Sequence, residues 1–269
     1  MTKRLHIIYW LGAMLSLSAC KDVFDNLYDD PVENMPTTQN QMYVDASSWT
    51  DWYYIDLNAV RDSITRDAHY VPTKAWKKYA IPRNTNADTN DQQNVKPSSP
   101  EGSEAVGIYT YWYDVFGEGL SNYRYQGFQP TEPQPEPTHW SFAVHRNNVR
   151  TNGGKVLETN YVLMEQLPAS SEAFKDSIFT ADEWNEQDVW TVQDQMLQGL
   201  IGSQGIKVNK VLSSWLRVDI PPMPPLFTLN SHIFIVRFAD GTHAALQLVN
   251  HMNEKGTKCC LTINYKYPY

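Results

Sequence analysis

The stretch WSFAVHRNNVRTNGG, residues 140–154, decides how this chain folds. Its first half alternates as a strand does, because Phe142 and Val144 point to one side and the residues beside them to the other. Asn152-Gly153 tolerates the positive φ of a two-residue hairpin, so we predict a tight reversal within residues 150–154. Most of the chain after this stretch also has the pattern of short strands and turns.

The clearest strands lie at the C-terminal end of the chain. Three runs of apolar and β-branched residues alternate with turn residues: strands at 232–238, 244–249 and 261–267, and turns at 239–242 and 253–257. Strands that follow one another through short turns pair as antiparallel neighbours. The sequence therefore predicts a three-stranded C-terminal meander.

Several other segments have strand patterns, namely 42–57 with a turn at 45–48, 107–116, 122–128, 155–157, 161–164 and 211–218. We expect a short helix to begin at residues 58–61, a loop or short helix at 170–179, and a flexible glycine-containing segment at 199–205. Aromatic residues make up 13% of the chain, which favours pleated, half-buried surfaces. The predicted fold is all-β and antiparallel, with few or no long helices.

Composition and motifs exclude several functions. The net charge of −8, without a cluster of Lys and Arg, argues against a nucleic-acid surface. The polar loop 84–104 lacks the mid-loop Gly and distal Glu of a calcium loop. No nucleophile elbow, zinc-protease or nucleotide-binding motif occurs, and the Glu183 and Glu186 pair is typical of a solvated acidic face. We therefore expect no enzymatic activity.

The N-terminal residues have the pattern of a processed leader. Lys3-Arg4 precedes an apolar run, residues 7–17, that is too short to span a bilayer. The run ends in Leu-Ser-Ala-Cys, which is similar to a bacterial lipobox and predicts lipidation of Cys20. This divides the chain into a lipoprotein signal peptide (1–19), a polar tether (20–40) and a single domain (41–269).

The cysteine, histidine and methionine side chains of the domain are the candidates for binding a metal, and few of them can be assigned a role from the sequence. The adjacent Cys259 and Cys260 are expected to be small buried residues, because neighbouring cysteines bridge each other only with strain. His145, in the middle of a strand, is typical of a structural histidine. Met223 lies among four prolines, and Met196 lies before a glycine-containing loop. Each methionine fits either an apolar contact or a soft axial ligand of a metal.

One family shares the most specific of these patterns. Trp140, the run Ala143-Val144-His145-Arg146 and the run Val149-Arg150-x-Asn152-x-Gly154 resemble the HmuY family of haem-binding lipoproteins from Bacteroidetes. Further matches are Asp45-Ala46-Ser47, Trp215-Leu216, Val236-Arg237, Ala239-Asp240-Gly241 and Tyr265-x-Tyr267-Pro268. The resemblance covers about 42–57 and 140–269, so residues 58–138 are expected to be an insertion.

The resemblance implies a hand-shaped β domain whose long loops grip one haem b between two axial side chains, without catalysis. Ungapped alignment places the family's second ligating histidine on Ile220, which cannot ligate. Met223, three residues on, has the Met-Pro-Pro setting of methionine-type members and is the expected ligand. Met196 is the candidate for the first ligand, and His145 matches a framework residue.

The resemblance also implies a cellular role. We expect a lipid-anchored outer-membrane protein, exposed at the surface, that acquires haem for its iron and passes it to a TonB-dependent haem transporter. The alternative is a surface lipoprotein on the same scaffold that binds a glycan or a siderophore, and the departure at Ile220 favours it. The sequence leaves open the ligand, the first axial residue, the role of 58–138 and the oligomeric state.

Overall fold

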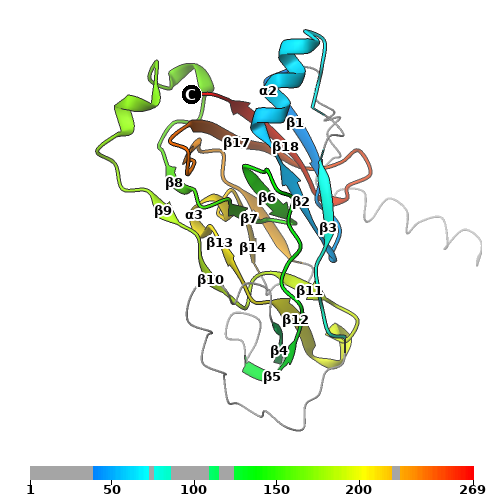
Figure 1. The fold of residues 1–269 in the computed structure, drawn as a ribbon. Helices are drawn as coiled ribbons and strands as arrows, with labels where there is room; N and C mark the ends of the chain where they lie inside the picture. The colour runs from blue at the N-terminus through cyan, green and yellow to red at the C-terminus, as the bar shows by residue number, and fades with distance from the viewer. Residues whose placement is uncertain (1–38, 73–75, 86–108, 115–123, 220–224) are drawn as a thin grey trace, which may run out of the picture.

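Antiparallel sheets make up most of the regular structure of the chain (Figure 1). The computed structural model describes residues 39–72, 76–85, 109–114, 124–219 and 225–269. Within them the α-helices are the ten-residue α2 (Leu57–Arg66) and the four-residue α3 (Lys210–Ser213). The prediction of an antiparallel all-β fold with few or no long helices is confirmed.

The largest sheet has six strands in the order β1-β18-β17-β16-β8-β9. Their bounds are β1 Gln41–Asp45, β18 Lys258–Lys266, β17 His243–Met252, β16 Phe234–Arg237, β8 Lys155–Glu158 and β9 Thr180–Ala181. Consecutive pairing of β16, β17 and β18 confirms the predicted meander. The first and last strands of the domain, β1 and β18, also lie side by side in antiparallel register.

A four-stranded sheet, in the order β3-β2-β6-β7, lies against the six-stranded sheet. Its strands are β2 (Asp51–Ile55), β3 (Lys77–Ala80), β6 (Phe142–His145) and β7 (Asn148–Thr151). Every residue of β6 and β7 is buried. Both faces of the sheet are therefore covered at β6 and β7, which form the central layer of the domain, whereas the edge strand β3 is largely exposed.

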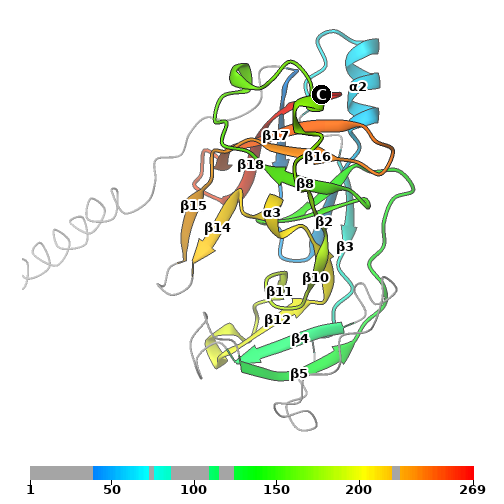
Figure 2. The ribbon, with the colours of Figure 1, turned by 90° about the vertical axis from the view of Figure 1, so that its left-hand side faces the viewer.

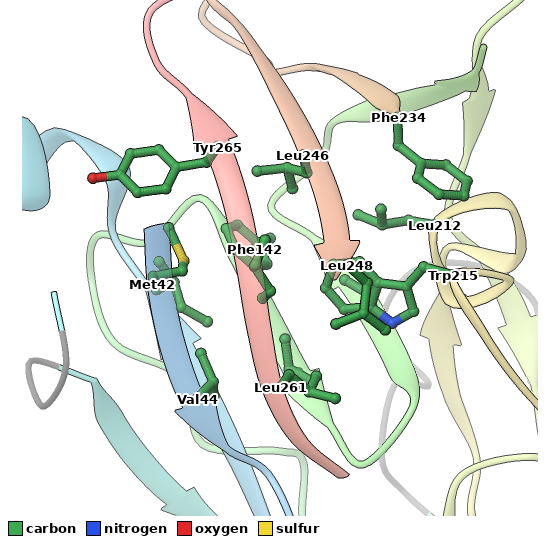
Figure 3. Packing of buried hydrophobic residues seen from close by; sticks show 14 of the residues in the cluster. Met42, Val44, Phe142, Leu212, Trp215, Phe234, Leu246, Leu248, Leu261 and Tyr265 are labelled. Atoms are coloured by element: carbon green, nitrogen blue, oxygen red, sulfur yellow. The ribbon is translucent and has the colours of Figure 1, made fainter. Parts of the chain in front are cut away.

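The main hydrophobic core fills the space between these two sheets (Figure 3). Phe142 and Val144 of β6 face Leu246, Leu248 and the neighbouring strands of the larger sheet. A second cluster, on the opposite face of the central sheet, contains Trp52, Tyr54, Trp140, Ala143, Ile206 and Val208. The alternation predicted for the strand at 142–145 is confirmed, since Phe142 and Val144 enter the main core and Ala143 enters the second cluster.

The remaining strands form smaller sheets, of which the four-stranded one lies at the end of the molecule far from α2 (Figure 2). One sheet has the order β11-β12-β4-β5, from Trp190–Val192, Leu200–Gln204, Tyr109–Asp114 and Arg124–Pro130. The two-stranded sheets are β10 (Glu183–Asn185) with β13 (Ile206–Val208), and β14 (Leu216–Asp219) with β15 (Leu226–Leu229). Within the described ranges, short 3-10 helices connect strands at η2 Met164–Gln166, η3 Ser171–Phe174 and η4 Met196–Gln198.

The tight hairpin of residues 140–154 lies earlier than the sequence predicts. Strands β6 and β7 pair directly, with His145 opposite Asn148, so the two turn residues are Arg146 and Asn147. Arg146 adopts a φ of 54° in this turn. Residues 152–154 instead carry the chain from the central sheet to β8 of the six-stranded sheet, and Gly153 there has a φ of 68°. The prediction of a hairpin at Asn152-Gly153 is therefore wrong.

Three further local predictions are wrong. Residues 161–164 form no strand and lead into η2. The strand expected at 211–218 begins only at Leu216, because Asn209 caps a helical turn by accepting a hydrogen bond from the Leu212 amide at 2.9 Å. The segment 199–205, expected to be flexible, contains strand β12, in which Ile201 is fully buried.

Residues 58–138 contribute α2, β3, β4 and β5 where the structure describes them. The strands predicted at 107–116 and 122–128 are present as β4 and β5 where the structure describes them, and the two strands pair with Tyr111 opposite Phe128. Strand β3 extends the central sheet, and β4 pairs with β12. Among the described residues, no helix is long and apolar enough to cross a membrane.

Candidate functional site

Met196 lies at the tip of the hairpin formed by β11 and β12. Residues 193–199 connect these strands, and η4 occupies the middle of the connection. The Met196 amide donates to the Gln193 carbonyl at 2.9 Å, and the Gly199 amide donates to the Met196 carbonyl at 3.0 Å. Gly199 ends the turn with a φ of 90°, a left-handed conformation that glycine adopts without strain. The backbone around Met196 is thus closed by its own hydrogen bonds.

The hairpin tip presents apolar side chains to solvent. Met196 is half-buried, and Leu197 beside it is 98% exposed. Leu226, the first residue of β15, is 54% exposed. Figure 2 shows the β14–β15 hairpin pointing towards the end of the molecule that carries β12 and η4. Neighbouring apolar side chains that share one exposed patch are typical of a surface that contacts an apolar partner, and Met196 and Leu197 are adjacent on this tip.

Two side chains connect the base of the β11–β12 hairpin to the central sheet. The amide of Gln204, the last residue of β12, accepts a hydrogen bond from Trp52 Nε1 at 2.9 Å and donates to Gln134 Oε1 at 3.0 Å. The imidazole of His145 lies 2.9 Å from the carbonyl oxygen of Trp190 in β11 and 2.9 Å from that of Asp51 in β2. Both Gln204 and His145 are buried, so these contacts are shielded from water.

Burial lowers the pKa of His145 from about 6.5 to about 4, although both backbone carbonyls favour the protonated ring. The ring is therefore neutral at pH 7 and packs at 5.4 Å from the Trp52 ring. Its role as a framework residue, implied by the resemblance, agrees with this position inside the protein.

The central sheet also carries a charged group that sequence reasoning did not single out. Arg150 is 6% exposed, and its guanidinium lies over the rings of Trp140 at 5.2 Å and Trp52 at 5.7 Å. Its Nη1 atom is 2.6 Å from Glu136 Oε1 and donates to the Tyr54 hydroxyl at 3.2 Å. Cation–π contacts and an ion pair compensate the burial of this charge. The sequence did contain an indication of this buried charge, because Arg150 is the one cation in a strand that is otherwise apolar and neutral.

The second proposed ligand, Met223, and the proposed lipidation site, Cys20, both lie outside the described residues, so the structure leaves the pair Met196 and Met223 as a prediction. Within the described part of the chain, no group of three or more His, Cys, Asp or Glu side chains could hold a metal ion. Cys259 and Cys260 are both buried, and burial raises the pKa of the Cys260 thiol to about 11.

The acidic pair considered from the sequence does not form a joint site. Glu183 is exposed and pairs with Lys210 at 3.7 Å, whereas Glu186 is buried and accepts a hydrogen bond from Trp184 Nε1 at 3.4 Å. The two carboxylates therefore have different surroundings, and the geometry gives no acid–base pair.

Comparison with known proteins places these features in a family. The family model described as "HmuY protein" matches residues 48–265, a range that includes 58–138. Among curated proteins, none matches the chain. Several solved structures match the chain. One is a protein of Bacteroides fragilis described as a lipoprotein, with 25% identity and a TM-score of 0.57 over 90% of this chain and 96% of that one.

Two further structures have the same fold. A protein of Bacteroides vulgatus, described as HmuY-like and haem-binding, has 26% identity and a TM-score of 0.55 over 89% of this chain and 98% of that one. Apo PinO, attributed to Porphyromonas gingivitis, has 18% identity and a TM-score of 0.59 over 84% and 95% of the two chains. The sequence match, spanning most of the domain, and the shared architecture agree, and the chain belongs to the HmuY family.

Proposed function

We propose that this protein binds haem without catalysis and holds the iron between two methionine side chains, Met196 and Met223. The observation that carries the proposal is the β11–β12 hairpin tip, where a half-buried methionine and an almost fully exposed leucine lie side by side on a closed turn. Membership of the HmuY family and similarity to a protein described as haem-binding support it.

The residues of the tip fit the chemistry of haem. A thioether is a soft, neutral donor that can occupy an axial position of haem iron. Such a weak donor depends on being held in place, and the hydrogen-bonded turn around Met196 supplies that constraint. The porphyrin ring is large and apolar, so Leu197 and Leu226 offer it contact area that water would otherwise cover.

A lipid anchor would set the cellular role. Lipidation at Cys20 would attach the domain to the outer membrane through the segment 20–40, and surface exposure would let it capture haem b and pass it to a TonB-dependent transporter. With two axial positions filled by protein side chains, the iron would have no open position for a substrate. We therefore propose haem acquisition and not an enzymatic reaction.

The decisive experiment is a haem titration of the protein lacking residues 1–20, followed by absorbance in the ferric and ferrous states. Met196→Ala and Met223→Ala versions are titrated in parallel, and Met164→Ala serves as a control methionine in η2. We expect a saturable Soret shift with low-spin bands in the parent and the control, and loss of those bands in both ligand variants. A saturable shift that neither ligand variant changes would reject methionine ligation, and no saturable shift would reject haem binding.

One observation favours a second candidate, a glycan. The half-buried rings of Trp49 and Trp190 lie nearly parallel, with centroids 6.3 Å apart, and the Arg146 guanidinium covers Trp49 at 4.1 Å. In this alternative, a sugar would stack on the outer face of the Trp190 ring. A protein that fails to bind haem but binds an oligosaccharide, with affinity lost in Trp190→Ala, would support this alternative.

A further inference from the structure

We infer that Gln204 is a positioning residue, whose buried amide sets where the turn that carries Met196 lies relative to the central sheet. Because Met196 is the proposed iron ligand, this role rests on the proposed function. It does not follow from the family match, since the hydrogen-bond partners of the Gln204 amide are Trp52 and Gln134 and not Met196. It follows from the way in which the β11–β12 hairpin is attached to the rest of the domain.

The β11–β12 hairpin is packed tightly enough that a displacement of its base also moves its tip. Gly202 of β12 faces Val192 of β11 so closely that a Cβ atom at Gly202 would lie 2.8 Å from the Val192 Cβ. The Leu200 amide donates to the Gln195 carbonyl at 3.1 Å, which joins the start of β12 directly to the turn. Strands packed this tightly move as one unit, so a displacement at Gln204 reaches η4.

Among the described residues, no strand ladder pairs β11 or β12 with the central sheet; the nearest backbone attachment follows β13, where the Asn209 amide donates to the Val149 carbonyl of β7 at 2.8 Å. The neighbours of β12 in its sheet are β11 and β4, and all three belong to the same small sheet. Side chains make the direct connections of the hairpin strands to the central sheet. In β11, the Thr191 carbonyl accepts a hydrogen bond from Arg83 Nη1 at 3.1 Å, and the Trp190 carbonyl lies 2.9 Å from His145 Nε2. In β12, the Gln204 amide contacts Trp52 and Gln134.

The contacts of Gln204 leave little freedom in how its amide is oriented. Its oxygen must accept from Trp52, whose indole nitrogen can only donate, and its nitrogen donates to Gln134 Oε1. The Gln134 nitrogen then donates to the Pro135 carbonyl at 3.0 Å and to the Ala80 carbonyl at 3.3 Å. One ordered series of hydrogen bonds therefore joins β12 to β2 and to the segment 131–139.

The test replaces Gln204 by leucine and compares it with a matched change far from the hairpin. Gln247 in β17 is also buried, and its amide nitrogen donates to the Val162 and Ser231 carbonyls, each at 2.7 Å. Gln247→Leu thus removes a comparable buried amide from the six-stranded sheet. Trp52→Phe, which removes the indole donor and keeps an aromatic ring, provides a milder second change at the hairpin.

Two measurements are made on each folded variant. In the haem-free protein, the methyl resonance of Met196 is followed by NMR and assigned with a Met196→Leu sample. We expect it to shift or broaden in Gln204→Leu and Trp52→Phe and to stay unchanged in Gln247→Leu. With haem bound, we expect the low-spin fraction to fall at least twofold in Gln204→Leu and to stay unchanged in Gln247→Leu.

The outcomes separate this inference from the proposed function. An unchanged Met196 resonance in both hairpin variants, or an equal change in Gln247→Leu, overturns the positioning role. If the resonance responds as expected but the parent binds no haem, the positioning role is supported and the proposed function fails. If the resonance responds but the haem spectrum does not, Gln204 does not position an iron ligand, and the inference is overturned.

Discussion

The Nε2 atom of His145 lies 2.9 Å from the carbonyl oxygen of Trp190. Its Nδ1 atom lies equally close to the carbonyl oxygen of Asp51, so both ring nitrogens face acceptors. A neutral imidazole carries one N–H group, and therefore only one of these carbonyls receives a hydrogen bond at a time. His145 lies between β11 and β2, and a protonated ring could donate a hydrogen bond to both carbonyls. Burial opposes that protonation by lowering the pKa of the ring.

The first prediction concerns how His145 makes folding stability depend on pH. In the unfolded chain His145 takes up a proton near pH 6.5, whereas in the folded protein its pKa is lowered to about 4 by burial. The unfolded state binds more protons between these values, so folding stability falls as the pH is lowered through this window. The loss should be on the order of 2 kcal/mol by pH 5. Urea denaturation at pH 7, 6 and 5 measures it.

A His145→Gln variant is the control for that experiment. It should be less stable than the parent at pH 7, but its stability should change less between pH 7 and pH 5. The other histidines are present in both proteins and cancel in the comparison. Equal pH dependence in the two proteins would show that His145 is not the group responsible.

The second prediction concerns packing inside the hairpin. Gly202→Ala should destabilise the protein by about 1–3 kcal/mol, because the new methyl group would overlap the Val192 side chain. Val192→Gly in the same chain removes both the Cβ and the Cγ2 atoms that the new methyl group would meet, so the double variant should lose less stability than the sum of the single variants. A double-mutant cycle by urea denaturation measures this coupling. Strict additivity would rule out the close contact.

The third prediction separates binding from folding. Leu197 is 98% exposed, so Leu197→Asp should change the free energy of unfolding by less than about 0.5 kcal/mol. If the side chain is covered by haem, its loss should raise the Kd for haem about tenfold or more. Ile178→Asp is the matched control, since Ile178 is 88% exposed between η3 and β9. A similar loss of affinity in both variants would argue against a specific contact at Leu197.

The fourth prediction concerns the redox state of the iron. Two thioether ligands should favour ferrous over ferric haem more than two imidazoles do, because sulfur is the softer donor. Met196→His in the haem-bound protein should therefore lower the reduction potential, and spectroelectrochemical titration measures it. Binding of ferrous haem no tighter than that of ferric haem would contradict ligation by Met196 and Met223.

Much of the fold could be predicted because its signals are local. The C-terminal meander has apolar runs separated by Asp240-Gly241 and by a polar turn, and each pair of strands is formed by neighbours in sequence. The wrong predictions depended on contacts that a single segment does not reveal. The segment 199–205 has the glycines of a flexible loop, yet Gly202 is needed for the close approach of β11.

The candidate site was predictable in part. Met196 could be singled out as a soft side chain before a glycine, but its place at the tip of a hairpin depends on the pairing of β11 with β12. Gln204 gave no signal, because a lone glutamine near a glycine is typical of a loop. Its importance appears only when Trp52 and Gln134, 152 and 70 residues away in sequence, lie within hydrogen-bonding distance.

The contrast between the buried base and the exposed tip of the β11–β12 hairpin bears on how such a protein can evolve. Gln204 and Val192 lie inside the protein, where most replacements disturb packing, whereas Leu197 contacts little else in the chain. Tip residues can therefore be exchanged at little cost to folding, and the side chains offered to a ligand can change while the frame stays the same. Relatives at 18% identity retain this fold, as expected for a scaffold that tolerates variation of this kind.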